Sequence, residues 1–559
     1  MLSVFLIWIY IFLTTMIISY PLLQKTSFRV EDRTMFGLMI ATVFSEYFSL
    51  IGKVGLVANI VLVSACLIIA IIFRKKMIGD LRRISSEFKG TKKRILFIVF
   101  AVLFIAFMTY GTSRGYFHVD SDLYHGQAIR WIEEYGLVKG LANLHMRLAY
   151  NSASFAATAL YSFSFLGGQS FHVVAGYIVT VMLAMSLRIF FSLRTKRVGV
   201  ADFARLGVIY YCFNIYDEMV SPASDYFAML YFLYIIVRVI EVSETEAHES
   251  KTDEYALIAM TAVFTVTVKM STLPVILVAA VPIYLLIREK KIRKIFIYFV
   301  TGFGIALPYF IREYFLSGRL LYPSTAFDIF SPVWKVPSWL AKMDSDYIIA
   351  FARGYSSTDA AEYPFRVWII NWLSKLSMTE KIMFMASICV ILLLPVSLIV
   401  RKKVRGFHIA EITCIASFVF WFFSAPLVRY GQGYLLILPV VMVGDVVLAI
   451  ADKAGEGKEK PKRKYRPVNI VFAAVTMLFI CYKLGISVLG IRENYAQGLY
   501  IKQLDYGKYE LIENDIDGVT VYSSPNGGGT GYDPFPATPF IEPGLSLIGE
   551  DIKSGFYYK

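Results

Sequence analysis

The residue types that can do chemistry in this chain are concentrated in one polar stretch, residues 118–150. This stretch carries three histidines and two closely spaced acids, His118, His125, His145, Asp120 and Asp122. It lies between long apolar runs, where a charged side chain is costly unless water, a partner or a substrate offsets its desolvation. We therefore interpret residues 118–150 as the working site.

The two acids of this stretch admit two interpretations. Asp120 and Asp122 precede a helical pattern that runs to Gly136, and an aspartate at a helix start is often only an N-cap. Alternatively, one of them takes a proton from a substrate hydroxyl as a general base. Their Asp-x-Asp spacing also suits a divalent cofactor ion such as Mg²⁺ or Mn²⁺. The spacing of the histidines matches no usual zinc pattern. His125 is therefore interpreted as a residue that forms a hydrogen bond within the protein or contacts the substrate.

The elements that must position these residues are membrane helices. The 559-residue chain is 57% hydrophobic and only 18% charged, whereas soluble domains average about 45–50% apolar and about 25% charged. Apolar runs of roughly 17–22 residues recur, and each can cross a ~30 Å hydrocarbon layer. The sequence predicts an all-α integral membrane protein with about 12–14 transmembrane helices. The five cysteines fall inside apolar runs and are expected to be free thiols.

The net charge of +14 is interpreted as membrane topology and not as a nucleic-acid surface. Most lysines and arginines lie in short loops, which is typical of cytoplasmic loops. The four basic loops assigned to the cytoplasm are 74–94, 288–294, 401–405 and 453–466. Alternation of the spans then places three segments outside the cytoplasm, namely 111–168, 311–379 and the tail 490–559. The basic loop 194–197 lands inside only if residues 151–166 do not cross, so that apolar segment is expected to lie along the outer interface. The loop 241–254, also assigned inside, is acidic, which is a mild conflict with the assignment.

These boundaries divide the chain into five parts. They are N-terminal helices with a basic loop (1–94), a catalytic transmembrane module (95–310), an aromatic-rich outer loop (311–379), C-terminal helices (380–489) and a small extracytoplasmic tail (490–559). The tail has strand-like pieces such as GVTVY and a Gly-rich turn at 526–531. That turn lacks the Gly-Lys-Ser/Thr ending of a phosphate-binding loop.

The first part of the catalytic module resembles the GT-C superfamily of polytopic membrane glycosyltransferases, which use polyprenyl-phosphate-linked sugars. The resemblance rests on DSDLYHGQAIRWIEEYG, ASFAATALYSFSFLGG, FHVVAGYIVTVMLAMSL and RTKR in that order. These look like the acidic motif with its helix, the second juxtamembrane helix, the crossing and the basic turn of that superfamily. Many relatives have a proline pair where this chain has Tyr150, Asn151 and Ser152. The whole arrangement also looks like a poorly characterised bacterial family associated with surface polysaccharide.

Three later segments extend the resemblance and imply further site residues. VKMSTLPVILV carries Lys269, YFIREYFLSGRLLYP carries Arg312, and APLVRYGQGYLLILPVV carries Arg429 and Tyr430. In the superfamily such residues lie at outer helix ends, so these cations are candidates for holding the donor phosphate. The alternative for the arginines is contact with lipid headgroups. Asp217, Glu218 and Asp225 lie on the next outer turn and are candidates for binding acceptor or metal, or are solvated loop charges.

The resemblance implies an inverting glycosyltransferase in a bacterial inner membrane, with its active site on the extracytoplasmic side. Asp120 or Asp122 would be the base, and the acceptor a lipid-linked or surface glycan. Two other functions remain open, an O-antigen-type polymerase or ligase and a transporter or flippase for a lipid-linked saccharide. A transporter predicts charges at mid-depth and paired broken helices. This sequence keeps most of its acids at the outer ends of spans, which favours the enzyme.

Overall fold

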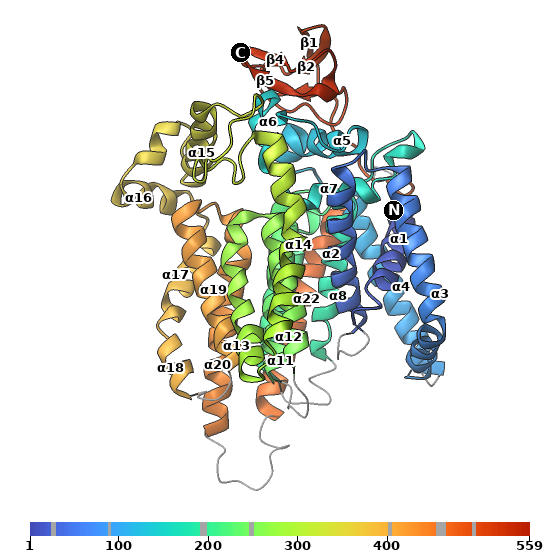
Figure 1. Ribbon diagram of the computed structural model, residues 1–559. Coiled ribbons are helices and arrows are strands. Elements are labelled where there is room, and N and C mark those ends of the chain that lie inside the picture. The colour runs from blue at the N-terminus through green and yellow to red at the C-terminus, as the bar shows by residue number, and fades with distance from the viewer. Residues whose placement is uncertain are drawn as a thin grey trace.

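Long apolar helices form the body of the molecule, as the computed structural model shows (Figure 1). It describes residues 1–23, 29–87, 91–190, 198–244, 251–400, 405–453, 466–494 and 499–559. The N-terminal half of the bundle contains α1 (Leu2–Ile18), α2 (Val30–Ser49), α3 (Leu56–Glu87), α4 (Thr91–Ser113), α8 (Val174–Ser186), α10 (Val200–Asn214), α11 (Ser224–Glu244) and α12 (Thr252–Val268). The C-terminal half contains η5 (Met270–Ala279), α13 (Ala280–Arg288), α14 (Ile292–Ser317), α17 (Met378–Ile391), α18 (Leu394–Val400), α19 (Arg405–Ser424), α20 (Val428–Lys453) and α22 (Arg466–Asn494).

Within the described residues, eight helices are long and apolar enough to cross a membrane. The chain is therefore a mainly helical, multi-pass membrane protein, as the sequence predicted. Other predicted spans fall on shorter helices, such as the 15-residue α10 and the 17-residue α12. The predicted 380–400 span is divided between α17 and α18. The expected total of about 12–14 crossings stays a prediction.

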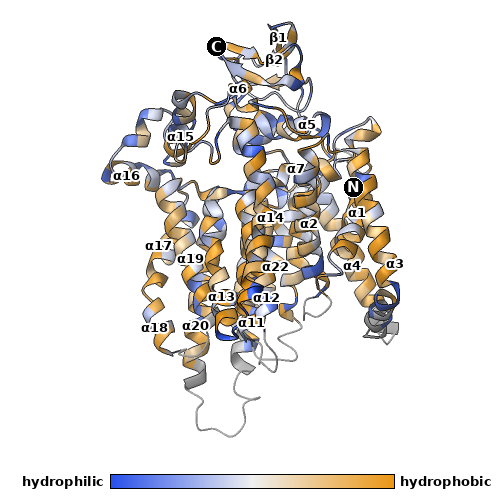
Figure 2. Ribbon diagram, viewed as in Figure 1, coloured by the Kyte–Doolittle hydropathy of each residue, from blue (hydrophilic) through white to orange (hydrophobic). Residues whose placement is uncertain are grey.

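The most buried of the long helices lies at the centre of the bundle, and helices with exposed apolar side chains lie at its outside, as expected for a membrane protein. α11 lies at the centre, with its side chains from Asp225 to Ile240 buried against α10, α12, α19 and α20. α3 and α4 lie at one side and expose apolar side chains such as Ile71 and Leu96. Figure 2 shows hydrophobic residues along the lengths of the long helices and more hydrophilic ones among the strands. Exposed apolar helix faces are stable in lipid, where the backbone hydrogen bonds are satisfied within each helix.

Short helices and strands gather at one end of this bundle, which we call the strand-bearing end (Figure 1). The helical elements there are η1 (Ser121–His125), α5 (Gly126–Glu134), α6 (Leu141–Leu144), η2 (Met146–Tyr150), α7 (Ala153–Tyr161), η3 (Ser164–Leu166), η4 (Tyr216–Glu218), α15 (Ser338–Ala352), η6 (Thr358–Glu362) and α16 (Phe365–Lys375). The three segments assigned to the outside of the cytoplasm thus share one end. The turn after α13, within the basic loop 288–294, lies at the opposite end. The basic segments 401–404, 454–465 and 191–197 are outside the described residues.

The apolar segment 151–166 differs from the expected interfacial helix. Its helix α7 has every residue from Ala153 to Tyr161 buried, packed against α2 and α5. Nine residues span only about 14 Å at ~1.5 Å per residue, which is too short to cross a bilayer. The segment therefore does not cross, but protein surrounds it instead of the membrane surface.

The tail folds into two small sheets. β1 (Ile512–Ile516) and β2 (Val519–Ser523) form an antiparallel hairpin, and β3 (Ala537–Thr538) pairs parallel with β2. β4 (Leu545–Leu547) pairs antiparallel with β5 (Phe556–Tyr558), and the short η8 (Ile552–Ser554) lies between them. The hairpin turn uses Asp517 and Gly518, both with positive φ, which is the geometry that two-residue hairpin turns need. The strand predicted at GVTVY is confirmed.

Candidate functional site

Asp120 is held by cations and does not cap a helix. It stands directly before η1, yet its side chain makes no cap hydrogen bond. One carboxylate oxygen accepts from Arg429 Nη2 at 2.6 Å and the other from Arg147 Nη1 at 3.3 Å. The Nδ1 atom of His118 lies 3.4 Å from the carboxylate. The N-cap interpretation of Asp120 is therefore wrong, and its charge serves an ion-paired site.

Arg429 connects Asp120 to a second buried acid. Its Nε atom lies 2.8 Å from Asp225 Oδ2, at the start of α11. Asp225 also pairs with Lys269, whose Nζ lies 3.6 Å from the centre of the Tyr430 ring. We call this group the ion cluster; its members are His118, Asp120, Arg147, Asp225, Lys269, Arg429 and Tyr430.

Breaks in the long helices place these side chains at the strand-bearing end. α12 ends at Val268, and Lys269 adopts an extended backbone before η5, which contains Pro274. α19 ends at Ser424, and the chain passes Pro426 before α20 begins at Val428. Proline lacks an N–H and restricts the preceding residue, so Pro426 accounts for the break between α19 and α20, whereas the break at Lys269 lies five residues before Pro274. Charged side chains at such junctions avoid the cost of mid-bilayer burial.

The ion cluster is accessible and carries an excess of positive charge. The side chains of Asp120 and Arg429 each keep 19% of their surface exposed, whereas Asp225 keeps only 6%. Three cations, Arg147, Lys269 and Arg429, face two carboxylates. Arginine and lysine in this number suit an anionic group such as a phosphate.

The ionisation states inside the ion cluster follow from this charge balance. Burial tends to raise the pKa of Asp120, but Arg429, His125, His118 and Arg147 together outweigh it, and the pKa lies below its usual value. Burial, together with Arg429, lowers the pKa of His118. At neutral pH the site therefore presents an ionised carboxylate beside a neutral imidazole. Either group can accept a proton.

His125 is a buried residue close to Asp120 of the ion cluster. It is buried, its Nδ1 atom lies 3.2 Å from Ser121 Oγ, and its ring packs on Tyr124 and Phe155. Burial lowers the pKa of His125 to about 3, so the ring is neutral. Direct contact with an acceptor, as expected from the sequence, would require it to move out of this packing.

Asp122 turns away from the ion cluster. Its carboxylate accepts a hydrogen bond from the backbone N–H of Gly507 at 3.4 Å and another from the Tyr509 hydroxyl, both in the tail. Asp120 and Asp122 thus have separate partners, which does not favour a shared Mg²⁺ or Mn²⁺ ion. Within the described part of the chain, no group of three or more His, Cys, Asp or Glu side chains is arranged to hold a metal.

Arg312 lies in a separate buried group. It donates to Asn151 Oδ1 at 2.9 Å and Ser49 Oγ at 2.5 Å, and it interacts electrostatically with Glu46 and Glu313. With 4% of its surface exposed, it lines a small pocket under α5. Arg312 thus has neutral acceptors as hydrogen-bond partners and two acids nearby, and no contact with the ion cluster is present among the described residues.

Asp217 and Glu218 occupy the rim. Glu218 Oε1 accepts from the Tyr116 hydroxyl at 2.9 Å, and the backbone carbonyl of Asp217 accepts from the Tyr116 N–H at 3.0 Å. Burial raises the pKa of Glu218, and Arg429 is one of the groups that oppose this shift. Glu218 therefore lies beside the ion cluster, whereas Asp217 contributes backbone structure.

Sequence reasoning missed Arg147 and gave Asp225 too little weight. Arg147 lies in η2 and has a side chain that is 16% exposed, beside Asp120 and the rings of Tyr124 and Tyr347. Its signal was an arginine within the polar stretch itself. The signal for Asp225 was an acid at the start of an otherwise apolar helix, where a charge needs a partner.

Three buried histidines make stability depend on pH. His125, His145 and His172 lie outside the spanning helices, and burial lowers the pKa of each to about 3 from the ordinary 6.5. Between these values the unfolded chain binds protons that the folded protein does not, so stability is present above pH 6.5 and is lost as the pH falls toward 3. We expect the thermal unfolding midpoint in detergent to fall between pH 7 and pH 5, and less steeply in His172→Asn. A midpoint that stays constant over this range would contradict the burial of neutral rings.

One family model matches the chain. It is described as a domain of unknown function (DUF8201), and it matches residues 1–436. The matched part contains every member of the ion cluster and ends before the tail. No curated protein matches the chain, and no solved structure matches it.

Proposed function

We propose that this chain, which belongs to the family of the domain of unknown function DUF8201, is a membrane glycosyltransferase of the GT-C type. It moves a sugar from a polyprenyl-phosphate donor to a lipid-linked or surface glycan on the extracytoplasmic side of a bacterial inner membrane. The observation that carries the proposal is the ion cluster. There an ionised aspartate meets three cations at a helix-bundle end that is partly open.

The ion cluster has the groups that this transfer needs. The acceptor hydroxyl attacks the anomeric carbon while the bond from that carbon to the phosphate oxygen breaks. Asp120 takes the hydroxyl proton, and the electron pair of the broken bond leaves with the phosphate. Arg429 and Lys269 stabilise the added negative charge on that leaving group. Attack from the face opposite the phosphate inverts the anomeric configuration.

The arrangement of the ion cluster also suits a donor that is held in the membrane. Lys269 and Arg429 stand at the first turns that follow helix breaks, so a phosphate at the bilayer surface can reach both. The ring of Tyr430 lies against the Lys269 ammonium in a cation–π contact. This contact restricts the lysine side chain before the donor binds, so less conformational entropy is lost on binding. The lipid tail of the donor would then lie along apolar helix faces.

Complementation tests the proposal. The gene is deleted in its native host, and surface and lipid-linked glycans are profiled by mass spectrometry after restoration with wild type or Asp120→Asn. Removal of a general base typically costs about 10²–10⁴-fold, so Asp120→Asn should fail to restore one defined sugar that wild type restores. Asp346→Asn is the matched control, because this acid lies on α15 and pairs with the exposed Lys342.

Equal membrane abundance of all variants is required, and Asp120→Glu tests whether a carboxylate in a shifted position retains part of the transfer. Full restoration by Asp120→Asn would remove Asp120 as the base. The polymerase or transporter functions would then take precedence.

A further inference from the structure

We infer that residues 499–559 of the tail form a positioning element that fixes the loop bearing His118 and Asp120. Asp122 and Gln127 are the residues through which it acts. The effect on catalysis rests on the proposed function, whereas the coupling of tail and loop can be measured without any activity. The tail lies beyond the part of the chain that the family model matches.

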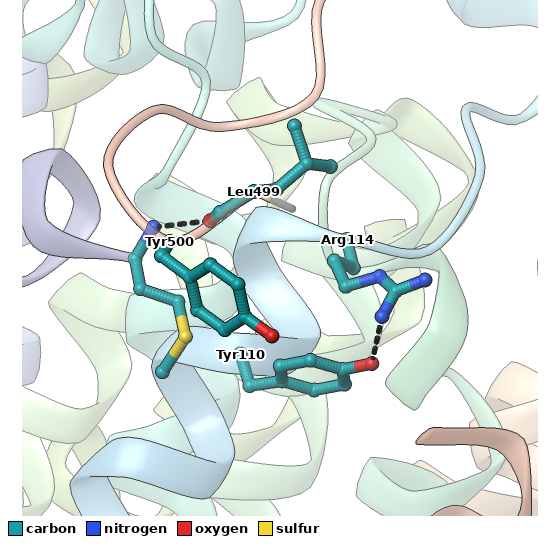
Figure 3. A pocket seen from close by; sticks show the side chains of 5 residues that line it. Tyr110, Arg114, Leu499 and Tyr500 are labelled. Atoms are coloured by element: carbon teal, nitrogen blue, oxygen red, sulfur yellow. Dashed lines mark hydrogen bonds between the residues drawn. The ribbon is translucent and has the colours of Figure 1, made fainter. Parts of the chain in front are cut away.

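The first part of the tail is tied to the helix bundle. Met1 donates its amino group to the Leu499 carbonyl at 2.9 Å, beside Tyr500, Tyr110 and Arg114 in the small pocket of Figure 3. A few residues later, the Leu504 N–H donates to the Ser113 carbonyl at the end of α4 at 2.8 Å. The tail therefore begins from a fixed point near the loop.

The tail then contacts the loop on the His118 side. The Tyr506 ring stacks on Phe117 with ring centres 4.3 Å apart, and its hydroxyl lies 2.8 Å from Nδ1 of the buried His172. Phe117 directly precedes His118, which contacts Asp120 and Arg429. Movement of Tyr506 would thus be passed to the ion cluster through one peptide unit.

A second contact lies on the other side of Asp120. The N–H groups of Thr530 and Gly531 donate to the backbone carbonyl of Asp122 at 2.8 and 2.9 Å. Gly531 has a φ of +66°, and a Cβ atom at Gly529 would lie 3.0 Å from the Tyr509 ring and 3.2 Å from the Asp122 side chain. The Gly-rich turn is therefore shaped to approach Asp122, which gives it a role other than phosphate binding.

Gln127 anchors the same turn one helical turn later. Its side chain is 1% exposed. Its Nε2 atom donates to the carbonyls of Gly531, Tyr532 and Pro534 at 3.0–3.3 Å, and its Oε1 accepts from the Ala537 N–H at 3.0 Å. A single buried amide thus shares its two N–H hydrogens among three carbonyls of the tail and accepts one N–H from it. Leaving such groups unsatisfied costs about 1–3 kcal/mol each.

Asp120 consequently sits between two fixed points that belong to the same tail. Catalytic groups act well only when their geometry is held in advance, and a displacement of about 1 Å can cost about 100-fold in rate. Asp122 is therefore assigned to positioning, because its carboxylate and carbonyl both bind the tail and neither reaches the ion cluster.

Hydrogen–deuterium exchange on the full-length protein in detergent tests the coupling. Gln127→Ala should speed amide exchange roughly tenfold or more in peptides covering 529–538 and, in the same variant, in peptides covering 117–125. Tyr509→Phe removes only the hydroxyl bond to Asp122 and should shift both segments less, in the same direction. Asn371→Ala is the matched control, since its amide also binds two backbone carbonyls, but those of Arg353 and Gly354. Faster exchange in 529–538 with unchanged exchange in 117–125, in both variants, would overturn the inference.

Kinetics separate positioning from substrate binding. Once a donor and acceptor are identified by the complementation experiment, Tyr509→Phe and Gln127→Ala should lower kcat, by up to about 100-fold for Gln127→Ala, and leave the donor KM unchanged. A rise in KM with constant kcat would overturn the positioning role. If wild type transfers no sugar while exchange in the two segments stays coupled, the proposed function fails and the coupling stands.

Discussion

Replacement of Arg429 by alanine is expected to abolish sugar transfer, with a loss of about 10²–10³-fold or more. Arg429 is the group that joins the two acids, because its Nη2 atom contacts Asp120 and its Nε atom contacts Asp225. Its removal takes away a phosphate ligand and also the charge that keeps the Asp120 carboxylate ionised and in place. Arg429→Lys should recover only part of the activity, since an ammonium cannot bridge two carboxylates with a planar fork of donors.

Glycan profiles of the deletion strain measure this loss at matched membrane levels. Arg366→Ala provides the control, because Arg366 is an exposed arginine on α16, away from the ion cluster. Transfer at the wild-type level by Arg429→Ala would contradict the assignment of the ion cluster as the reaction centre. Loss in both variants would point to a general effect on membrane insertion.

Replacement of Arg312 by methionine is expected to destabilise the protein by about 1–3 kcal/mol, because the buried acceptors Asn151 Oδ1 and Ser49 Oγ lose their donor. Glu46 and Glu313 are both fully buried, and Arg312 is the cation that interacts with them. Both oxygens of Glu46 lack a hydrogen-bond partner, so this acid depends on the nearby guanidinium. Methionine has a similar shape and leaves the two acids without that charge.

Unfolding in mixed micelles and accumulation in membranes measure the effect. Arg366→Met at the exposed site should leave stability within about 0.5 kcal/mol of wild type. Wild-type stability of Arg312→Met, together with loss of activity, would favour the phosphate-binding role that the sequence resemblance implies.

The sequence predicted that Asp120, Lys269, Arg429 and Tyr430 belong to one site, because the family resemblance places these residues on the outer side of the membrane. Lys269 and Arg429 also interrupt apolar runs, where a charge without a partner is costly. The membrane class followed from composition for the same reason.

The local sequence pattern did not predict the direction in which each side chain points. Asp122 is two residues from Asp120, yet it faces tail residues that come about four hundred positions later in the chain. Arg312 stands at a helix end as expected, but acids on α2 and α14 surround it. α7 was expected at the lipid surface because it is apolar, and only tertiary packing decides that protein covers it. Contacts between distant segments decide all three cases.

The members of the ion cluster lie far apart in the sequence, so the ribosome adds them at different times. Asp225 and Lys269 are 44 residues apart and can pair as soon as α12 is made, whereas Arg429 follows Asp120 by 309 residues. During synthesis Asp120 and Asp225 are therefore present before Arg429 is translated, and at that stage only Arg147 and Lys269 can pair with them. The complete ion cluster therefore forms only after Arg429 has been made, so a chain that terminates before this residue lacks it.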